Sequence, residues 1–213
     1  MIINSFKYFV NILMSSRITS YFFEDIMKLI LASNSPRRKQ ILTEMGLEFE
    51  VIPSNYDEKL PDNIFSYEKI EDLATQKCLD VVRRVKDGET VLAADTVVVL
   101  HNKILGKPHS KEEAFEMLKE LSGATHSVVT SICAINTKTN RAALLSTTSY
   151  VRFTEWTDEM IHYYIDEFNP LDKAGSYGIQ ELPSNYLDKF EGSFENIVGL
   201  APESVEAVLN QIK

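Results

Sequence analysis

The sequence predicts an α/β protein built on a mixed β-sheet. Short apolar runs that suit buried strands, such as 29–32 and 90–100, alternate with segments such as 67–85, in which apolar residues recur at helical spacing. The strand-like runs 126–136 and 141–153 are joined by a short polar segment in the manner of a hairpin, so part of the sheet is antiparallel. Helices and strands mixed in this order are typical of α/β proteins.

The composition is that of an ordinary globular protein, and the charge disfavours one class of partner. Of 213 residues, 44% are hydrophobic and 25% charged, which is enough for a core in one domain or two small lobes. A formal net charge of −9 argues against nucleic-acid binding, which needs a basic surface. A phosphate ligand would therefore be bound by a local cluster of positive side chains, together with a divalent cation.

Cysteine and histidine usage predicts a cytoplasmic protein with reduced thiols. Cys78 and Cys133 lie far apart, and there is no Cys-x-x-Cys or Cys/His cluster to indicate zinc or a disulfide framework. The four histidines show no metal-ligand spacing, so each is interpreted as a surface or core residue.

Residues 1–26 are interpreted as an N-terminal extension outside the fold. Their apolar pieces are interrupted by Lys7 and Asn11, so they are too broken to span a bilayer and lack the apolar segment of a signal peptide. We expect a single globular domain over 27–213, with the upstream residues added by start-site choice. N-terminal analysis of the natively expressed protein tests this.

The first candidate site is the turn between an apolar strand at 29–32 and the helix that follows it. Ser35, followed by proline, fits a helix N-cap. Arg37 and Arg38 would then lie beside unpaired backbone N–H groups, and Ser33 adds a hydroxyl, so the turn suits a phosphate chain. A capped surface helix with two solvated arginines explains these residues alone equally well.

The next two elements each carry a candidate charge. A strand at 49–52 leads into a loop with Asp57 and Glu58, whose oxygens suit magnesium, although solvated turn residues are the alternative. The helix predicted over 67–85 carries Lys77 on or beside its apolar stripe. Its amine would seek an anion or simply reach solvent at the edge of the core.

Asp95 lies in the middle of the apolar run 90–100, next to Thr96. A carboxylate in such a run is costly unless it is paired, hydrogen-bonded or metal-bound. Metal binding and general-base catalysis both need such a group, while a structural aspartate at a strand break is the alternative. Beyond a turn at 101–102, Lys107 lies between a glycine and a proline and could project toward Asp95.

The remaining elements follow in order. Ser110 and Glu113 form the sequence pattern of a full capping box for the next helix. After the hairpin, a helix opens near Thr157 with an acidic first turn. The loop 169–180, rich in glycine and charge, is interpreted as a second site loop. A short hairpin is expected from 186–190 and 193–198, and a terminal helix begins near Pro202.

Five motifs together resemble the Maf (septum formation) family of nucleoside triphosphate pyrophosphatases. They occupy residues 31–38, 94–96, 106–108, 121–123 and 172–180. The resemblance implies an elongated mixed sheet with flanking helices, in two lobes around a central cleft, akin to inosine triphosphate pyrophosphatases. It also implies hydrolysis of a nucleoside triphosphate to the monophosphate and pyrophosphate, aided by Mg²⁺ or Mn²⁺.

The resemblance assigns roles position by position. Asp95 matches the proton acceptor, and Glu58 matches an acidic position that could hold the metal together with Asp95. The phosphate-binding positions are Ser33, Arg37, Arg38, Lys77 and Lys107. We expect Arg38 chiefly to hold phosphate and Arg37 to bear on substrate choice as well.

Three positions that separate family branches by base preference read Arg37, Thr96 and Gln180. This combination resembles the branch acting on dTTP and UTP, whereas the 7-methyl-GTP branch has Trp, Gln and Glu there. A glutamine offers a donor and an acceptor to a pyrimidine edge. One departure concerns Glu181, where the pyrimidine branch usually has glycine, and it bears on substrate choice more than on reaction type.

Two alternatives stay open from the sequence. One is a non-catalytic nucleotide-binding regulator of septum formation, against which the buried Asp95 argues. The other is the same reaction on 7-methyl-GTP or on another nucleotide, such as a damaged purine or pyrimidine triphosphate removed in housekeeping. No membrane or nucleic-acid partner is expected, and a homodimer is possible.

Overall fold

The computed structural model describes residues 28–213, so the expectation for residues 1–26 lies outside the described residues. Seven strands form one mixed sheet in the order β2-β1-β3-β5-β6-β7, with β4 paired to β3. The pairs β1–β2 and β1–β3 are parallel, and the other pairs are antiparallel. The strands are β1 (Lys28–Leu31), β2 (Phe49–Val51), β3 (Glu89–Leu100), β4 (Lys103–Leu105), β5 (Thr125–Asn136), β6 (Arg141–Phe153) and β7 (Leu187–Glu191). The predicted α/β class with a mixed sheet is confirmed.

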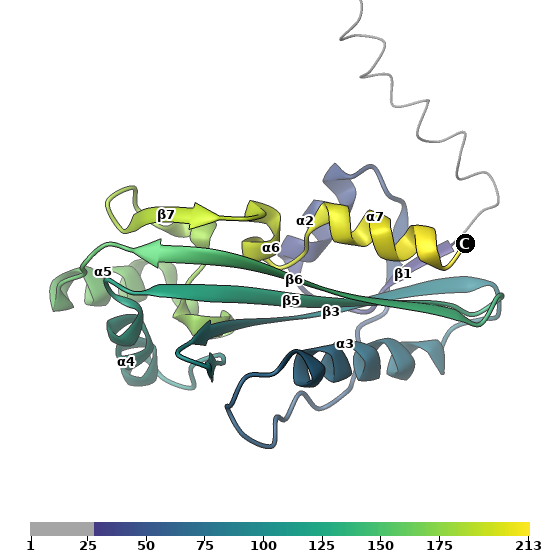
Figure 1. Cartoon of the computed structure of the whole chain (residues 1–213), viewed down its shortest axis with the longest axis horizontal. Coiled ribbons are helices and arrows are strands. Elements are labelled where there is room, and N and C mark those ends of the chain that lie inside the picture. Colours follow the sequence, from purple (N-terminus) through teal and green to yellow (C-terminus); the bar gives the residue numbers. More distant parts are fainter. Residues whose placement is uncertain (1–27) are drawn as a thin grey trace, which may run out of the picture.

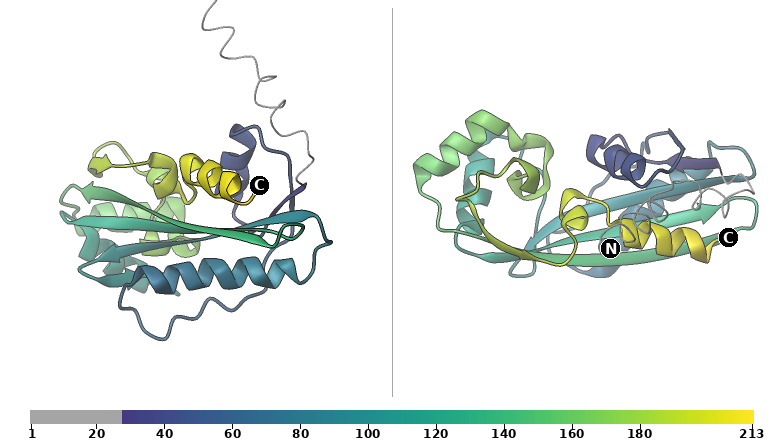
Figure 2. Two further views of the ribbon diagram at one scale, coloured as in Figure 1. Left: turned by 45° about the vertical axis from the view of Figure 1, so that its right-hand side comes forward. Right: turned by 90° about the horizontal axis from the view of Figure 1, so that it is seen from above.

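Helices cover both faces of this sheet. Figure 1 shows α3 on one face and α2, α6 and α7 on the other, and Figure 2 shows the same separation from a second side. The helices are α2 (Pro36–Glu44), α3 (Tyr67–Val82), α4 (Lys111–Leu121), α5 (Asp158–Phe168), α6 (Phe194–Val198) and α7 (Pro202–Gln211). Among the described residues, no helix has the length and apolar content needed to cross a membrane.

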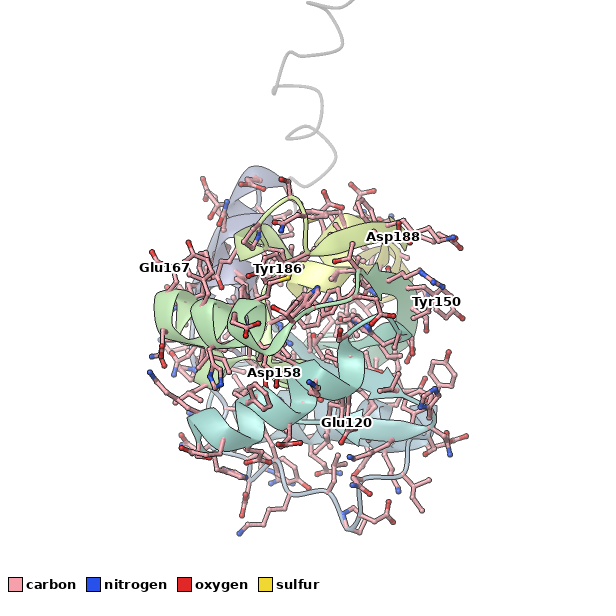
Figure 3. The ribbon with its side chains drawn as sticks, turned by 90° about the vertical axis from the view of Figure 1, so that its left-hand side faces the viewer. Glu120, Tyr150, Asp158, Glu167, Tyr186 and Asp188 are labelled. Atoms are coloured by element: carbon pink, nitrogen blue, oxygen red, sulfur yellow. The ribbon has the colours of Figure 1, made fainter. Side chains whose placement is uncertain are left out.

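The molecule is elongated, with helices gathered toward two ends of the long strands. Figure 2, seen from above, places α4 and α5 at one end of β3, β5 and β6 and α2 toward the other. Figure 3 views the first end directly, with Glu120 on α4 and Asp158 on α5. Buried aromatic rings fill this end, since Phe153 stacks on Trp156 with ring centroids 4.5 Å apart. A buried aromatic cluster therefore closes this end of the sheet.

The sequence prediction was wrong for 193–198, which forms α6 instead of a strand. The Ser193 hydroxyl accepts a hydrogen bond from the Asn196 amide, and Gly199, at a φ of 127°, ends the helix. Buried Asn196 then donates to the Val128 carbonyl and so fixes α6 on β5. Strand β7 pairs with β6 and not with 193–198. An N-cap serine was mistaken for a strand residue.

Two smaller differences concern helix ends. Helix α3 ends at Val82, three residues before the predicted end. At the start of α4, the Ser110 hydroxyl accepts from the Glu113 amide as expected, but the Glu113 carboxylate accepts from the His109 amide at 2.7 Å. In a full capping box the glutamate carboxylate would accept from the Ser110 amide, but here it accepts from the residue before Ser110. Only one of the two predicted capping bonds is therefore present.

Candidate functional site

A cavity of about 420 Å³ opens between the α2 turn and the segment 172–180. Of the candidate site residues singled out from the sequence, nine line it, whereas Asp57 does not and instead pairs with Lys59 at 2.7 Å. The nine are Ser33, Arg37, Arg38, Glu58, Lys77, Asp95, Thr96, Lys107 and Gln180. These residues come from six separate parts of the chain, so the fold gathers them into one cleft.

The cleft lies where one edge of β3 loses its neighbour. Strand β1 pairs with β3 only as far as Leu92, and β4 pairs with it only from Val98 onward. No described strand covers residues 93–97 on that edge, whereas β5 pairs with β3 along the other. Successive side chains of a strand point to opposite faces, and the open edge lets both Asp95 and Thr96 reach the cleft.

The ion pair at the centre of the cleft joins α3 to β3. Lys77 Nζ lies 2.5 Å from Asp95 Oδ1 and 2.8 Å from Glu58 Oε1, and the side chains of Lys77 and Asp95 are 7% and 9% exposed. The lysine therefore does not simply reach solvent at the core edge. Asp95 lies opposite Ser131 in an unbroken pairing with β5, so it does not mark a strand break either. A buried lysine between two carboxylates compensates charges that would be costly alone.

Glu58 is the exposed member of this group, with 49% of its side chain accessible. Burial raises the pKa of Glu58, but the charge and hydrogen bond of Lys77, followed by the charges of Lys107 and Arg38, outweigh it and lower the pKa. The carboxylate is therefore kept ionised at neutral pH by several cations. Lys107 itself is exposed on the rim.

Arg38 is anchored almost entirely to the protein. Its Nε donates to the Gly199 carbonyl at 3.0 Å, and one terminal nitrogen donates to the Ala94 carbonyl at 2.9 Å and to Ser33 Oγ at 3.3 Å. The other terminal nitrogen donates to Thr96 Oγ1 at 2.9 Å. Since a guanidinium has five N–H groups, one is left for a ligand. Arg38 contributes its charge to the cleft and at the same time ties α2 to β3.

The Thr96 hydroxyl, like Arg38, forms hydrogen bonds within the protein. Its hydroxyl accepts from Arg38, lies 3.0 Å from Thr130 Oγ1 and donates to the Gly199 carbonyl at 3.3 Å. Its proton and at least one lone pair are therefore used within the protein. Thr96 therefore helps to fix the position of Arg38.

Arg37 points away from Arg38 toward the loop on the other side. Its side chain is 30% exposed, and its guanidinium lies 3.7 Å from a carboxylate oxygen of Asp172. The two arginines follow each other in the first turn of α2, where Ser35 caps the Arg38 amide and proline occupies the first helical position. Neighbouring residues of a helix point in different directions, so the two side chains diverge. The alternative of two solvated arginines does not hold for Arg38.

The loop opposite consists of three short 3-10 turns, η2 (Pro170–Asp172), η3 (Ala174–Ser176) and η4 (Ile179–Glu181), and Gln180 is exposed on the last. The Tyr164 hydroxyl accepts from the Gly178 amide at 3.0 Å. The Gly175 amide donates to the Gly106 carbonyl at 3.0 Å, next to Lys107. The two loops of this wall are thus bonded to each other.

Sequence reasoning did not single out Lys173 or Thr130. Lys173 belongs to the motif 172–180, yet a lysine in a charged loop gives no sign that it is buried. Thr130 lies in an ordinary strand pattern, and its contact with Thr96 depends on the pairing of β3 with β5. Gly199 contributes only a carbonyl oxygen, for which side-chain chemistry offers no signal.

The cleft places several cationic side chains beside a buried carboxylate, an arrangement that suits a polyanionic ligand. The chain belongs to the Maf family, because the family model described as Maf-like protein matches residues 28–212. This confirms the resemblance found in the sequence.

Relatives with assigned names cover most of the chain. A dTTP/UTP pyrophosphatase of Clostridium perfringens is 44% identical over 82% of this chain and 91% of that protein. Proteins of the same name from Acetivibrio thermocellus and Bdellovibrio bacteriovorus are 41% and 38% identical, over 82% and 86% of this chain and 90% and 97% of theirs. Among solved structures, the Ham1 protein of Staphylococcus aureus is 16% identical with a TM-score of 0.42, covering 59% of this chain and 71% of that one.

Proposed function

We propose that this protein hydrolyses dTTP and UTP to the monophosphate and pyrophosphate, as a nucleotide-pool housekeeping enzyme. The observation that carries the proposal is buried Asp95, paired with Lys77 at the open edge of β3 and facing the cationic turn of α2. A binding-only regulator has no need for a buried base. The names of the Clostridium, Acetivibrio and Bdellovibrio relatives support the choice of reaction and of nucleotides.

The reaction divides among the side chains as follows. Asp95 takes a proton from a water as the water oxygen bonds to the α-phosphorus. The bond from that phosphorus to the α,β-bridging oxygen breaks, and pyrophosphate leaves with the bonding electrons. Lys77, Lys107 and the free N–H of Arg38 supply positive charge to the triphosphate oxygens. Lys77 must then shift part of its bonding from the carboxylates to phosphate.

The residues present fit a hard divalent cation. Glu58 and Asp95 both bond the Lys77 ammonium, so the two carboxylates already face one cation and offer it hard oxygen ligands. The described residues contain no group of three or more His, Cys, Asp or Glu side chains able to hold a metal. One or two carboxylates plus substrate phosphates are sufficient for Mg²⁺, which keeps several waters. Bound Mg²⁺ or Mn²⁺ would neutralise negative charge on the phosphate oxygens.

Substrate choice is assigned to Arg37, Thr96 and Gln180. Exposed Gln180 offers a donor and an acceptor to a pyrimidine edge, and Arg37 lies on the same side of the cleft through its contact with Asp172. Thr96 contributes through Arg38. A cytoplasmic location and a homodimer remain predictions.

A nucleotide panel tests this function. Purified protein is incubated with dTTP, UTP, 7-methyl-GTP and modified nucleotides in the presence of Mg²⁺ or Mn²⁺, and pyrophosphate is measured. We expect release with dTTP, UTP and modified pyrimidine nucleotides, and little with 7-methyl-GTP or modified purine nucleotides. Release only with 7-methyl-GTP would change the substrate, and binding without pyrophosphate from any nucleotide would favour the non-catalytic regulator.

A further inference from the structure

Lys173 is a buried cation at the rim of the cleft. Its side chain is 8% exposed, and its Nζ lies 2.9 Å from Asp172 Oδ1 and 3.3 Å from Glu181 Oε2. A buried ammonium is costly unless carboxylates compensate its charge. The lysine therefore favours the loop conformation that brings both carboxylates to it.

One of the two carboxylates, that of Glu181, belongs to the turn that carries Gln180, and the other, that of Asp172, belongs to η2. The Glu181 amide donates to the Gly178 carbonyl at 3.0 Å, which closes the turn around Gln180. A methyl group placed on Gly178 would meet Glu181 Oε2 at 3.1 Å and Lys173 Cε at 3.2 Å, so both side chains pack directly on this backbone. From the other side, the Tyr164 hydroxyl accepts from the Gly178 amide.

The same ion pairs reach the second base-selecting position. Asp172 is bound by Lys173 and lies 3.7 Å from the Arg37 guanidinium. Burial raises the pKa of Asp172, but the hydrogen bond and charge of Lys173, followed by the charge of Arg37, outweigh it and lower the pKa. The chain of contacts Arg37–Asp172–Lys173–Glu181 thus runs from one base-selecting residue to the neighbour of the other.

We propose that Lys173 is a positioning residue for base selection and that Glu181 is a specificity-determining residue. Lys173 holds Arg37, through Asp172, and the Gln180 turn in one geometry, and Glu181 supplies the second carboxylate to the lysine. The charge of Glu181 therefore stiffens the base-selecting turn and does not displace it. This inference rests on the proposed function and concerns how its substrate is chosen.

Lys173→Met removes the charge and keeps the length of the side chain. For dTTP and UTP we expect kcat/KM to fall about tenfold, chiefly through a higher KM with little change in kcat, because the reacting groups lie elsewhere. Activity on purine triphosphates should fall less, so selectivity decreases. Glu181→Gln should change selectivity in the same direction by a smaller factor. Lys111→Met, which removes an exposed lysine paired with Asp166, is the matched control and should change neither kcat/KM nor selectivity.

The outcomes separate positioning from a merely structural role. An equal loss on all nucleotides, or a loss in kcat with KM unchanged, would overturn the proposal. If Lys173→Met does not fold, Glu181→Gln decides, and unchanged selectivity in that variant overturns it. Affinity for α,β-imido-dUTP and for its purine counterpart is measured in parallel. If the wild-type protein hydrolyses nothing, the proposed function fails, while the affinity ratio still tests the positioning.

Discussion

The two walls of the cleft differ in how firmly the protein itself holds their side chains. On the reaction wall, Arg38, Lys77 and Asp95 are bonded to backbone carbonyls or to one another. On the loop wall, Arg37 makes a long ion pair and Gln180 is exposed. The side chains proposed to act on the triphosphate are therefore preorganised, whereas the exposed side chains proposed to choose the base can change without disturbing the fold.

The largest expected effect comes from the reaction wall. Asp95→Asn keeps the shape of the side chain, but the amide cannot take a proton and offers Lys77 no negative charge. Turnover of dTTP should fall by roughly 10²–10⁴-fold, the range for a lost general base, while nucleotide binding persists. Steady-state kcat and the affinity for α,β-imido-dUTP measure the two separately.

Glu58→Gln is the matched control, because it removes the other carboxylate bound by Lys77. Its loss of turnover should be smaller than that of Asp95→Asn. A near-normal rate in Asp95→Asn would remove this residue from the base role.

The difference between the two walls can also be measured as a difference in stability, with Arg38 representing the reaction wall and Arg37 the loop wall. Arg38→Lys replaces a guanidinium with four bonded directions by a single ammonium, so several buried acceptors lose their donor. We expect the free energy of unfolding to fall by about 2–3 kcal/mol. Arg37→Lys should cost less than about 0.5 kcal/mol, since its 3.7 Å ion pair is partly exposed. Urea titrations of both variants measure these free energies of unfolding. Equal losses in the two variants would contradict the proposed difference between the walls.

The sequence predicted the parts of the site that local chemistry determines. Ser35 as a cap and Lys77 on the α3 stripe follow from spacing within one element. The open edge at 93–97 did not follow, because it depends on where two other strands stop pairing with β3. The helix at 193–198 was missed because its apolar pattern suits a short strand equally well, and packing of Asn196 on β5 decides between them.

The loop wall has its own buried support, which predicts a pH effect. His126 donates to or accepts from the Tyr177 hydroxyl at 2.8 Å, and burial lowers the pKa of His126 to about 3. The unfolded chain, with a pKa of about 6.5, binds more protons between these values. This contribution to stability is therefore full above pH 6.5 and is lost as the pH falls toward 3. Lowering the pH from about 6.5 to about 5 should remove roughly 2 kcal/mol.

His126→Gln should flatten this pH dependence, because the amide can still bond the Tyr177 hydroxyl and does not titrate. Urea titrations at several pH values measure it. His101→Gln, at an exposed turn, is the control and should leave the slope unchanged. The same slope in wild type and His126→Gln would show that other groups dominate.

The smallest expected effect comes from the exposed part of the loop wall. Gln180→Glu replaces an amide that offers a donor and an acceptor by a carboxylate that only accepts, beside the existing charge of Glu181. We expect kcat/KM for dTTP and UTP to fall about tenfold, while the free energy of unfolding changes by less than about 0.5 kcal/mol. Competition between dTTP and 7-methyl-GTP in one reaction measures selectivity directly. Unchanged selectivity would refute the role of Gln180, and a large loss of stability would show that the loop wall is as firmly held as the reaction wall.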